Sequence, residues 1–343
     1  MRVQEGLVRG YVDLLVRRTK KRCTRVDPTT GALERRPLDL RTWYNWTTFD
    51  VIGDLCFGES SGMLENASYD PWVETLNSST QQIAFVKSMI SLGFAWLMDL
   101  FVPIDRRRLI TTERPDLIDP LLKLHESGQL PTPKVVANAS TILAAGSETP
   151  ATLLTGLTYL LCKSPEALKR VTHEVRSTYT LEDEIMLMSV SKLDYMLACL
   201  DEAMRLYPPV ATGLPRTIHR GGDQVAGHFF PEGTTVAVYQ WAANRSTMNF
   251  HDPLACHPER FLSYRPAVFD QDRREATQPF SVGPRNCVGK NLAIAEMRQI
   301  LARILFSFDL EFVNRGLDWL HMDYQKSYFL WDKPTMEVYL TPV

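Results

Sequence analysis

The ten residues Phe280–Gly289, FSVGPRNCVG, constrain this chain more than any other stretch of its sequence. They place one cysteine, Cys287, between glycines at 283 and 289, directly before an alanine- and leucine-rich segment that predicts a helix. Glycine allows tight turns and close backbone approach that a Cβ would block. At a helix N-terminus, the free N–H groups and the helix dipole stabilise a thiolate. The stretch therefore predicts a thiolate that acts as a nucleophile or a metal ligand; a buried structural cysteine is the ordinary alternative.

The composition is that of a globular protein and gives no sign of nucleic-acid binding. Hydrophobic residues make up 45% of the 343 residues and the formal net charge is −2, so the chain can bury a large core and has no general attraction for polyphosphate. We find no clean linker and expect one domain over 1–343. The six cysteines form no CxxC pair, which favours a reducing compartment over a disulfide framework. The amphipathic N-terminus does not resemble a signal peptide.

The hydrophobic pattern predicts a mainly α fold with a minor β portion. The segment 134–163 is the longest expected helix, and its apolar character predicts burial almost all round. Between 210 and 279 glycine, proline and short β-type runs dominate, and 234–239 is the clearest strand. The other expected elements are helices over about 1–26, 39–57, 71–104, 165–178, 191–206 and 290–308, and strands over 310–313 and 336–340.

The most apolar run is Phe85–Ile104. Lys87 and Asp99 lie within it and are costly at the centre of a bilayer, so we expect no transmembrane helix there. A core helix is the first interpretation. An apolar surface helix that makes a peripheral membrane contact is the second.

Two charged motifs follow the long helix. Glu202 and Arg205 lie three residues apart and hence on one face of the helix that ends at Pro208-Pro209, and Arg260 lies in the later loop Pro258-Glu259-Arg260-Phe261. A solvent-exposed ion pair is the ordinary interpretation of such spacing.

Two further motifs carry polar or glycine residues in unexpected places. Ala144–Pro150, AAGSETP, interrupts the long apolar helix, and such residues cost helix stability. A kinked core helix with satisfied side chains is the ordinary alternative to a functional groove. Gly213–Arg216, GLPR, follows the helix that carries Glu202.

Together with the cysteine loop, these motifs resemble those of cytochrome P-450 monooxygenases. The pattern F-x-x-G-x-R-x-C-x-G matches the family's haem-thiolate loop, A-G-x-[DE]-T matches its oxygen-binding groove, and E-x-x-R with P-E-R-F matches its structural ion triad. The resemblance implies the P-450 fold and haem b as cofactor, with Cys287 as the axial ligand of the iron. It also implies cofactor-binding roles for Phe280, Gly283, Arg285, Gly289, Arg216 and Gly146, catalytic roles for Thr149 and Glu148, and a buried triad of Glu202, Arg205 and Arg260.

Within this resemblance, the Thr149 hydroxyl would hydrogen-bond bound dioxygen, and Glu148 would relay protons from solvent. Arg216 and Arg285 would bind the haem propionates, and His219 or Arg220 could substitute for Arg216. The ion triad would fix the loop region beneath the haem. Each of these roles is carried over from the family.

The resemblance is closest to fungal microsomal members that hydroxylate terpenoid or polyketide secondary metabolites, such as isotrichodermin-type hydroxylases. It implies a lipophilic small-molecule substrate, dioxygen, and electrons from a separate NADPH-dependent reductase, because the chain has no GxGxxG nucleotide fingerprint. Lys290 and Arg298 are candidate docking residues for that reductase. An intracellular place at the endoplasmic reticulum membrane is expected.

One departure from the family pattern concerns the front of the chain. Members of this type begin with a membrane anchor, a β-rich segment and helices that carry a W-x-x-x-R motif, and none of these precedes Met1. We therefore expect an N-terminally truncated P-450 fold. An alternative interpretation is a truncated, catalytically impaired remnant with weak or no haem binding. A third keeps the haem for isomerisation or peroxide-driven chemistry; Glu148 and Thr149 disfavour it, because those reactions need no proton relay to dioxygen.

Overall fold

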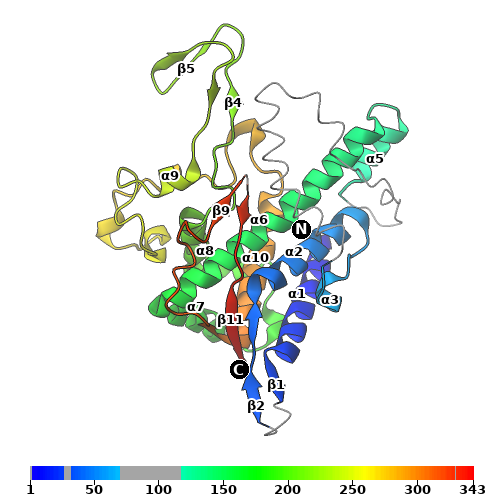
Figure 1. Ribbon diagram of the computed structural model, residues 1–343, viewed down its shortest axis with the longest axis vertical. Helices are drawn as coiled ribbons and strands as arrows, with labels where there is room; N and C mark the ends of the chain where they lie inside the picture. The colour runs from blue at the N-terminus through cyan, green and yellow to red at the C-terminus, as the bar shows by residue number, and fades with distance from the viewer. Residues whose placement is uncertain (1, 27–31, 70–116, 329) are drawn as a thin grey trace.

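A computed structural model describes residues 2–26, 32–69, 117–328 and 330–343. It confirms the mainly α fold with a minor β portion. The long helix α6 (Thr132–Lys163) crosses the centre of the molecule, with α1 (Arg2–Arg22) and α2 (Leu40–Phe57) on one side and α7 (Pro165–Thr178) and α8 (Asp194–Leu206) on the other (Figure 1). Helix α10 (Lys290–Ser307) packs against α6, α7 and α1. The shorter helices are α3 (Met63–Asn66), α5 (Asp119–Glu126) and α9 (Gln240–Asn244).

The predicted long helices begin and end within a few residues of the observed ones, with one exception at the N-terminus. The helix expected over 1–26 ends at Arg22, and Thr24–Val26 forms strand β1, which pairs antiparallel with β2 (Leu33–Arg35). Threonine and valine are β-branched and favour strands. The helix predicted over 71–104, with the apolar run Phe85–Ile104, lies outside the described residues.

The largest sheet has three antiparallel strands and joins distant parts of the chain. Strand β11 (Glu337–Pro342) lies between β3 (Pro37–Asp39) and β8 (Phe308–Phe312), with Val338 opposite both Leu38 and Phe312. The remaining strands form two-stranded ribbons: β4 (Arg216–Thr217) with β7 (Thr235–Val236), β5 (Asp223–Val225) with β6 (His228–Phe230), and β9 (Lys326–Ser327) with β10 (Trp331–Asp332). The strand expected over 234–239 is therefore only two residues long.

Helix α6 is buried all round only in its C-terminal half. Every residue from Pro150 to Leu161 is buried, whereas before Pro150 only every fourth residue faces the core, at Val135, Ala139, Leu143 and Ser147. The all-round burial expected for the whole helix is thus wrong for its first half. That half is amphipathic and leaves one side uncovered by the described residues.

Two glycines let other elements approach α6 closely. A Cβ at Gly146 would lie 2.6 Å from Ile52 Cγ1 of α2, and a Cβ at Gly156 would lie 2.3 Å from Tyr207 Cδ1 at the end of α8. Such distances are far below van der Waals contact, so both helix crossings require glycine.

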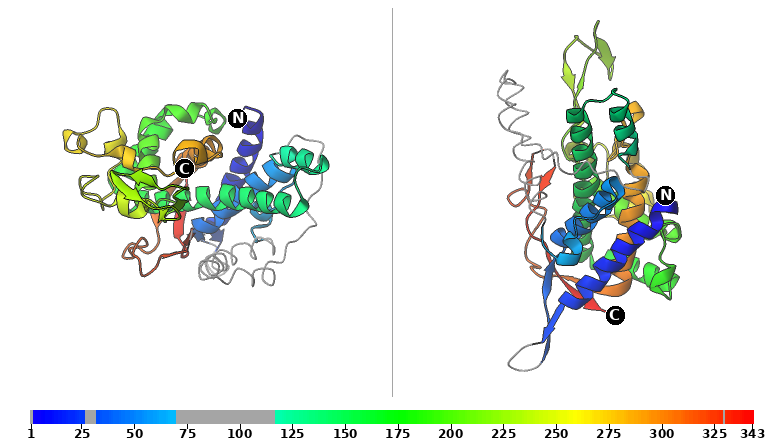
Figure 2. Two further views of the ribbon diagram at one scale, coloured as in Figure 1. Left: turned by 90° about the horizontal axis from the view of Figure 1, so that it is seen from above. Right: turned by 90° about the vertical axis from the view of Figure 1, so that its right-hand side faces the viewer.

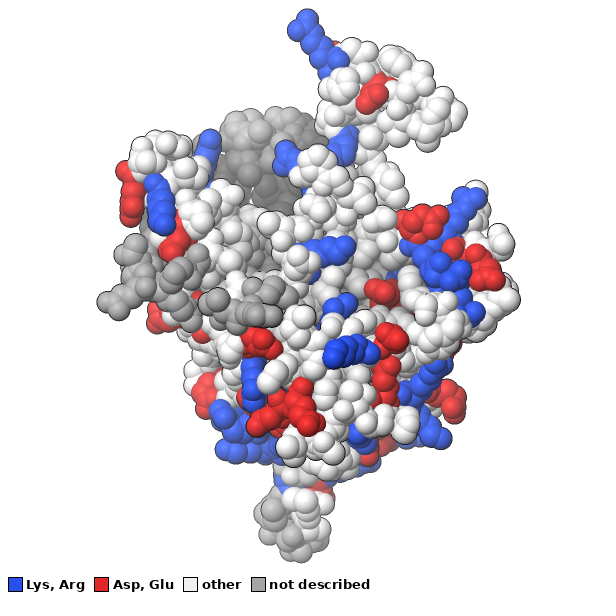
Figure 3. All heavy atoms as spheres, turned by 180° about the vertical axis from the view of Figure 1, so that it is seen from behind, with Lys and Arg blue, Asp and Glu red and all other residues white. Residues whose placement is uncertain are grey.

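Two β-ribbons project from the helical body, and charged side chains are distributed over its surface. The β5–β6 ribbon extends beyond one end of the helical body and the β1–β2 ribbon beyond the other (Figure 2). Seen from behind, positive and negative side chains are interspersed over the lower half of the molecule, and neither sign gathers into a continuous patch (Figure 3). No helix within the described ranges has an apolar stretch long enough to cross a bilayer.

Helix α10 carries a buried carboxyl group. Glu296 is 2% exposed, and among the described residues its Oε1 atom has no hydrogen-bond partner. Burial raises the pKa of Glu296 well above its ordinary value. Burial therefore favours the neutral, protonated form of the side chain in the folded protein.

We expect Glu296→Gln to raise the free energy of unfolding at neutral pH and to flatten its pH dependence. An unfolded glutamate ionises near about pH 4.3. Above that pH the unfolded chain binds fewer protons than the folded one, so the wild type loses stability as pH rises toward the folded-state pKa. Urea unfolding between about pH 5 and pH 8 measures this slope. Glu166→Gln, at an exposed position on α7, is the control; equal slopes in wild type and Glu296→Gln would contradict the prediction.

Candidate functional site

The structure brings Glu202, Arg205 and Arg260 together in the interior, where all three are fully buried. Arg205 Nε and Nη2 donate to the two Glu202 carboxylate oxygens, both at 2.8 Å, and Arg260 Nε lies 3.2 Å from Glu202 Oε2. The surface pair that the spacing alone suggests is thus replaced by a buried triad. Buried charges persist only where each is paired and hydrogen-bonded.

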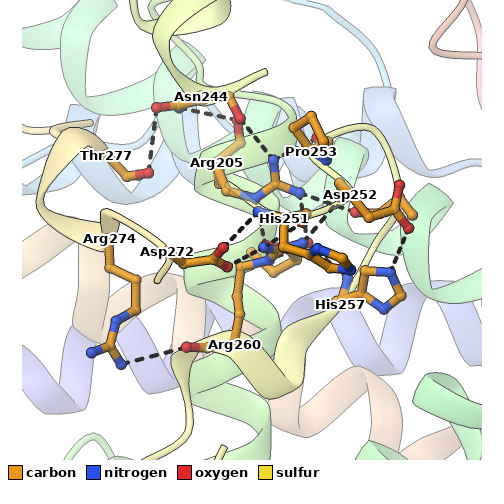
Figure 4. Close-up of polar contacts among 12 residues, drawn as sticks. Arg205, Asn244, His251, Asp252, Pro253, His257, Arg260, Asp272, Arg274 and Thr277 are labelled. Atoms are coloured by element: carbon orange, nitrogen blue, oxygen red, sulfur yellow. Dashed lines mark hydrogen bonds and ion pairs between the residues drawn. The ribbon is translucent and has the colours of Figure 1, made fainter. Parts of the chain in front are cut away.

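The triad is saturated by partners from the loop that follows α9. Arg205 donates to the main-chain carbonyls of Asn244, Pro253 and Ala255, at 2.8, 2.6 and 3.0 Å. Arg260 pairs with the buried Asp272, whose other oxygen accepts the His251 N–H (Figure 4). These bonds tie the loop over 244–272 to helix α8. Asp272 was not singled out from the sequence, because it lies in a loop where no periodicity links it to Arg260.

The cysteine loop begins with a turn that needs glycine. Gly283 has φ +73°, in the left-handed region, and opens a short 3₁₀ turn over Gly283–Arg285. The Cys287 N–H donates to the Phe280 carbonyl at 2.8 Å, which closes the loop. Gly289 has φ −84°, and a Cβ there would lie 4.0 Å from the sulfur, so neither its conformation nor its packing requires glycine.

Cys287 differs from the other five cysteines, all of which lie in the described part of the chain. Its side chain is exposed just before α10, whereas the others are buried or partly buried. Burial raises the pKa of the Cys162 and Cys256 thiols to about 12. Cys287 is therefore the exposed thiol among the six.

On α6, the predicted groove residues point in three directions. Ala145 is exposed and Thr149 is half-buried one turn later; the Thr149 hydroxyl donates to the Ala145 carbonyl at 2.7 Å. Gly146 faces Ile52 of α2 and not the side shared by Ala145 and Thr149. Glu148 forms an ion pair with Lys333, a residue that the sequence analysis did not single out.

The two candidate propionate-binding arginines are both exposed. Arg216 Nη1 donates to the carbonyl of Pro215, and within the described residues neither Arg216 nor Arg285 has a carboxylate partner. His219 instead lies 3.6 Å from Asp223. Both guanidinium groups are thus available to an external carboxylate.

An exposed cysteine thus lies at the start of α10, and Thr149 lies on the less covered side of α6, the helix against which α10 packs. The chain belongs to the cytochrome P450 family, whose model matches residues 3–338.

Fungal monooxygenases are similar over nearly the whole chain. The cytochrome P450 monooxygenase tpeC of Talaromyces stipitatus is 46% identical over 99% of this chain and 68% of its own length. The averantin hydroxylase of Dothistroma septosporum is 40% identical over 100% of this chain and 66% of its own length. The trichothecene C-15 hydroxylase of Fusarium sporotrichioides is 40% identical over 99% of this chain and 71% of its own length. The chain thus spans about two thirds of each of these relatives.

The residues fit the haem that the family implies. The exposed Cys287 thiol suits the iron, and the unpaired Arg216 and Arg285 suit the two propionates. Val282 and Val288 are 63% and 102% exposed on the same loop, and such uncovered apolar side chains suit an apolar ring.

Proposed function

We propose that this protein hydroxylates a lipophilic secondary metabolite with dioxygen, using haem b ligated by Cys287 and electrons from an NADPH-dependent reductase. The observation that carries the proposal is the exposed Cys287 at the start of α10 in a chain of the cytochrome P450 family. Two similar proteins are named as hydroxylases, of averantin and of trichothecenes at C-15. Their substrates suggest the class of a polyketide or a terpenoid, and nothing narrower.

Three residues of the chain would have separate roles in the reaction. A thiolate-ligated haem supplies the dioxygen chemistry, because the thiolate's electron donation favours O–O cleavage. The Cys287 sulfur would hold the iron, with the Gly283 turn keeping it exposed. The Thr149 hydroxyl would offer a hydrogen bond on the open side of α6, and the Glu148 carboxylate would hold and pass a proton.

The remaining residues would hold the cofactor and the electron donor. Arg216 and Arg285 would pair with propionates, and the triad around Glu202 would keep the loop region before Phe280 rigid. Lys290 is exposed and suits a reductase surface. Arg298 is half-buried, and burial lowers the pKa of its guanidinium group, so it suits that role less well.

We also propose how the chain is divided into domains and where in the cell it lies. One hydrophobic core contains residues from nearly the whole length of the chain, from Val8 to Leu340, which supports a single domain. The endoplasmic reticulum membrane is the place we propose, by analogy with fungal microsomal members. The alternative of an impaired remnant finds no support, because core, triad and cysteine loop are all in place.

The reduced carbon-monoxide difference spectrum of the purified, haem-loaded protein tests the proposal. We expect the Soret band typical of thiolate ligation, and hydroxylated products when reductase, NADPH and a panel of fungal polyketides and terpenoids are supplied. A band typical of a neutral ligand, or protein that takes up no haem, would refute it. Turnover with peroxide but none with reductase and NADPH would refute the reductase-driven mechanism.

A further inference from the structure

Lys333, from the C-terminal segment, contacts Glu148 on helix α6. Lys333 is 4% exposed, and its ammonium contacts the Glu148 carboxylate and the Thr152 hydroxyl, the latter at 2.8 Å. Thr152 lies one turn after Glu148 on α6 and donates to the same Oε1 oxygen at 3.5 Å. The two partners explain how the ammonium group can be buried, since a buried ammonium without partners would be strongly disfavoured.

Main-chain and ring contacts hold Lys333 where it is. Its carbonyl accepts a hydrogen bond from Arg41 Nη1 at 2.7 Å, at the start of α2. Two residues earlier, Trp331 stacks on Tyr207 with ring centroids 5.0 Å apart, and its indole N–H donates to the Pro208 carbonyl at 2.8 Å. The lysine is therefore fixed to α2 and to the end of α8 before it meets α6.

The contact orients the carboxylate. Both donors bind Oε1, while no partner of Glu148 Oε2 is seen among the described residues, and the Glu148 side chain is 17% exposed. Adjacent residues of a helix point about 100° apart, so Glu148 faces Lys333 while the neighbouring Thr149 shares the open side with Ala145. One oxygen is held and the other is left to exchange a proton.

Other titratable side chains lie near Glu148: the phenols of Tyr207 and Tyr69 and, beside Tyr69, the guanidinium group of Arg41, which forms an ion pair with Asp39. Burial raises the pKa of both phenols. Both are therefore neutral at physiological pH. Lys333 is the cation that contacts the acid within the described part of the chain.

We propose that Lys333 is a positioning residue for proton delivery: it holds Glu148 Oε1 and leaves Oε2 as the oxygen that exchanges protons. This inference rests on the proposed function, because it assigns Lys333 to the acid that the proposed mechanism uses. Lys333 acts through Glu148.

The test compares Lys333→Met, Lys333→Arg and Glu148→Gln with the wild type, and Lys326→Met, at an exposed position on β9, is the control. We expect Lys333→Met to keep the thiolate spectrum but to lower product formed per NADPH about tenfold, and Glu148→Gln to lower it about a hundredfold, in the range of a positioned proton donor. Lys333→Arg keeps the charge and restores most of the coupling, and Lys326→Met has no effect. The double variant Lys333→Met/Glu148→Gln is no worse than Glu148→Gln, because both changes affect one step.

A second readout needs no haem. The infrared carboxyl band of Glu148, assigned as the band present in wild type and absent in Glu148→Gln, shifts in Lys333→Met because Oε1 loses the ammonium that binds it. Unchanged coupling and an unchanged carboxyl band in Lys333→Met would overturn the inference, as would additive losses in the double variant. Wild-type protein without a thiolate spectrum would instead refute the proposed function, while the infrared band would still show whether Lys333 orients Glu148.

Discussion

We expect replacement of Cys287 with alanine to remove the thiolate-type carbon-monoxide spectrum and to lower hydroxylation to the level of free haem. The reason is that alanine cannot supply the electron donation by which a thiolate ligand favours O–O cleavage. The remaining five cysteines are buried or partly buried. None is presented at the start of a helix next to a glycine turn, as Cys287 is.

The same replacement leaves the fold intact. Cys287 is exposed, and the hydrogen bond that closes its loop uses the main-chain N–H, which alanine retains. We expect the free energy of unfolding without haem to change by no more than about 0.5 kcal/mol. Cys256→Ala, which removes a partly buried thiol, is the control and should keep both spectrum and activity. Hydroxylation by Cys287→Ala at the wild-type rate would rule out the assigned ligand.

Glu202→Gln destabilises the protein by about 3–5 kcal/mol, the typical cost of removing one partner from a buried ion pair. The change leaves the fully buried guanidinium groups of Arg205 and Arg260 without their shared carboxylate. Because Arg205 also holds three carbonyls of the 244–272 loop, we expect that loop to become sensitive to proteolysis and haem to dissociate faster. Denaturant unfolding followed by circular dichroism measures the loss.

The chain offers a matched control for this variant. Glu311 also pairs with two arginines, Arg35 and Arg315, each at 2.8 Å, but at the surface. Glu311→Gln should cost only about 0–1 kcal/mol, as exposed pairs do. Equal losses in the two variants would show that burial does not set the cost, and would contradict the assigned role of the triad.

Much of the fold could be predicted because its signals are local. Apolar periodicity located α2, α6, α7, α8 and α10, and the motif around Cys287 located the exposed thiol. Strand β1 was missed because it is stabilised by pairing with Leu33–Arg35, and no local pattern in the sequence links the two segments. The burial of α6 was overestimated because composition alone does not show which side a neighbouring helix covers.

In the candidate site too, residues with local signals could be predicted and residues with distant partners could not. Lys333 and Asp272 could not be found in advance, because their partners lie 185 and 12 residues away in sequence and no pattern connects them. The orientation of Gly146, in contrast, could be predicted from its position in the helix. Ala145 and Thr149 are four residues apart and share one face of a helix, whereas Gly146 lies about 100° round from Ala145. Helical phase thus indicates that Gly146 belongs to a different face.

The three-stranded sheet determines when the protein can finish folding during synthesis. Leu38 of β3 pairs with Val338 of β11, about 300 residues later. At about 5–20 residues per second, roughly 15–60 s separate the emergence of the two strands from the ribosome. Closing so long a loop costs on the order of 5 kcal/mol of chain entropy. The nascent chain therefore carries an unpaired β3 edge until β11 is made, and faster translation or chaperone binding over that interval should raise the yield of folded protein.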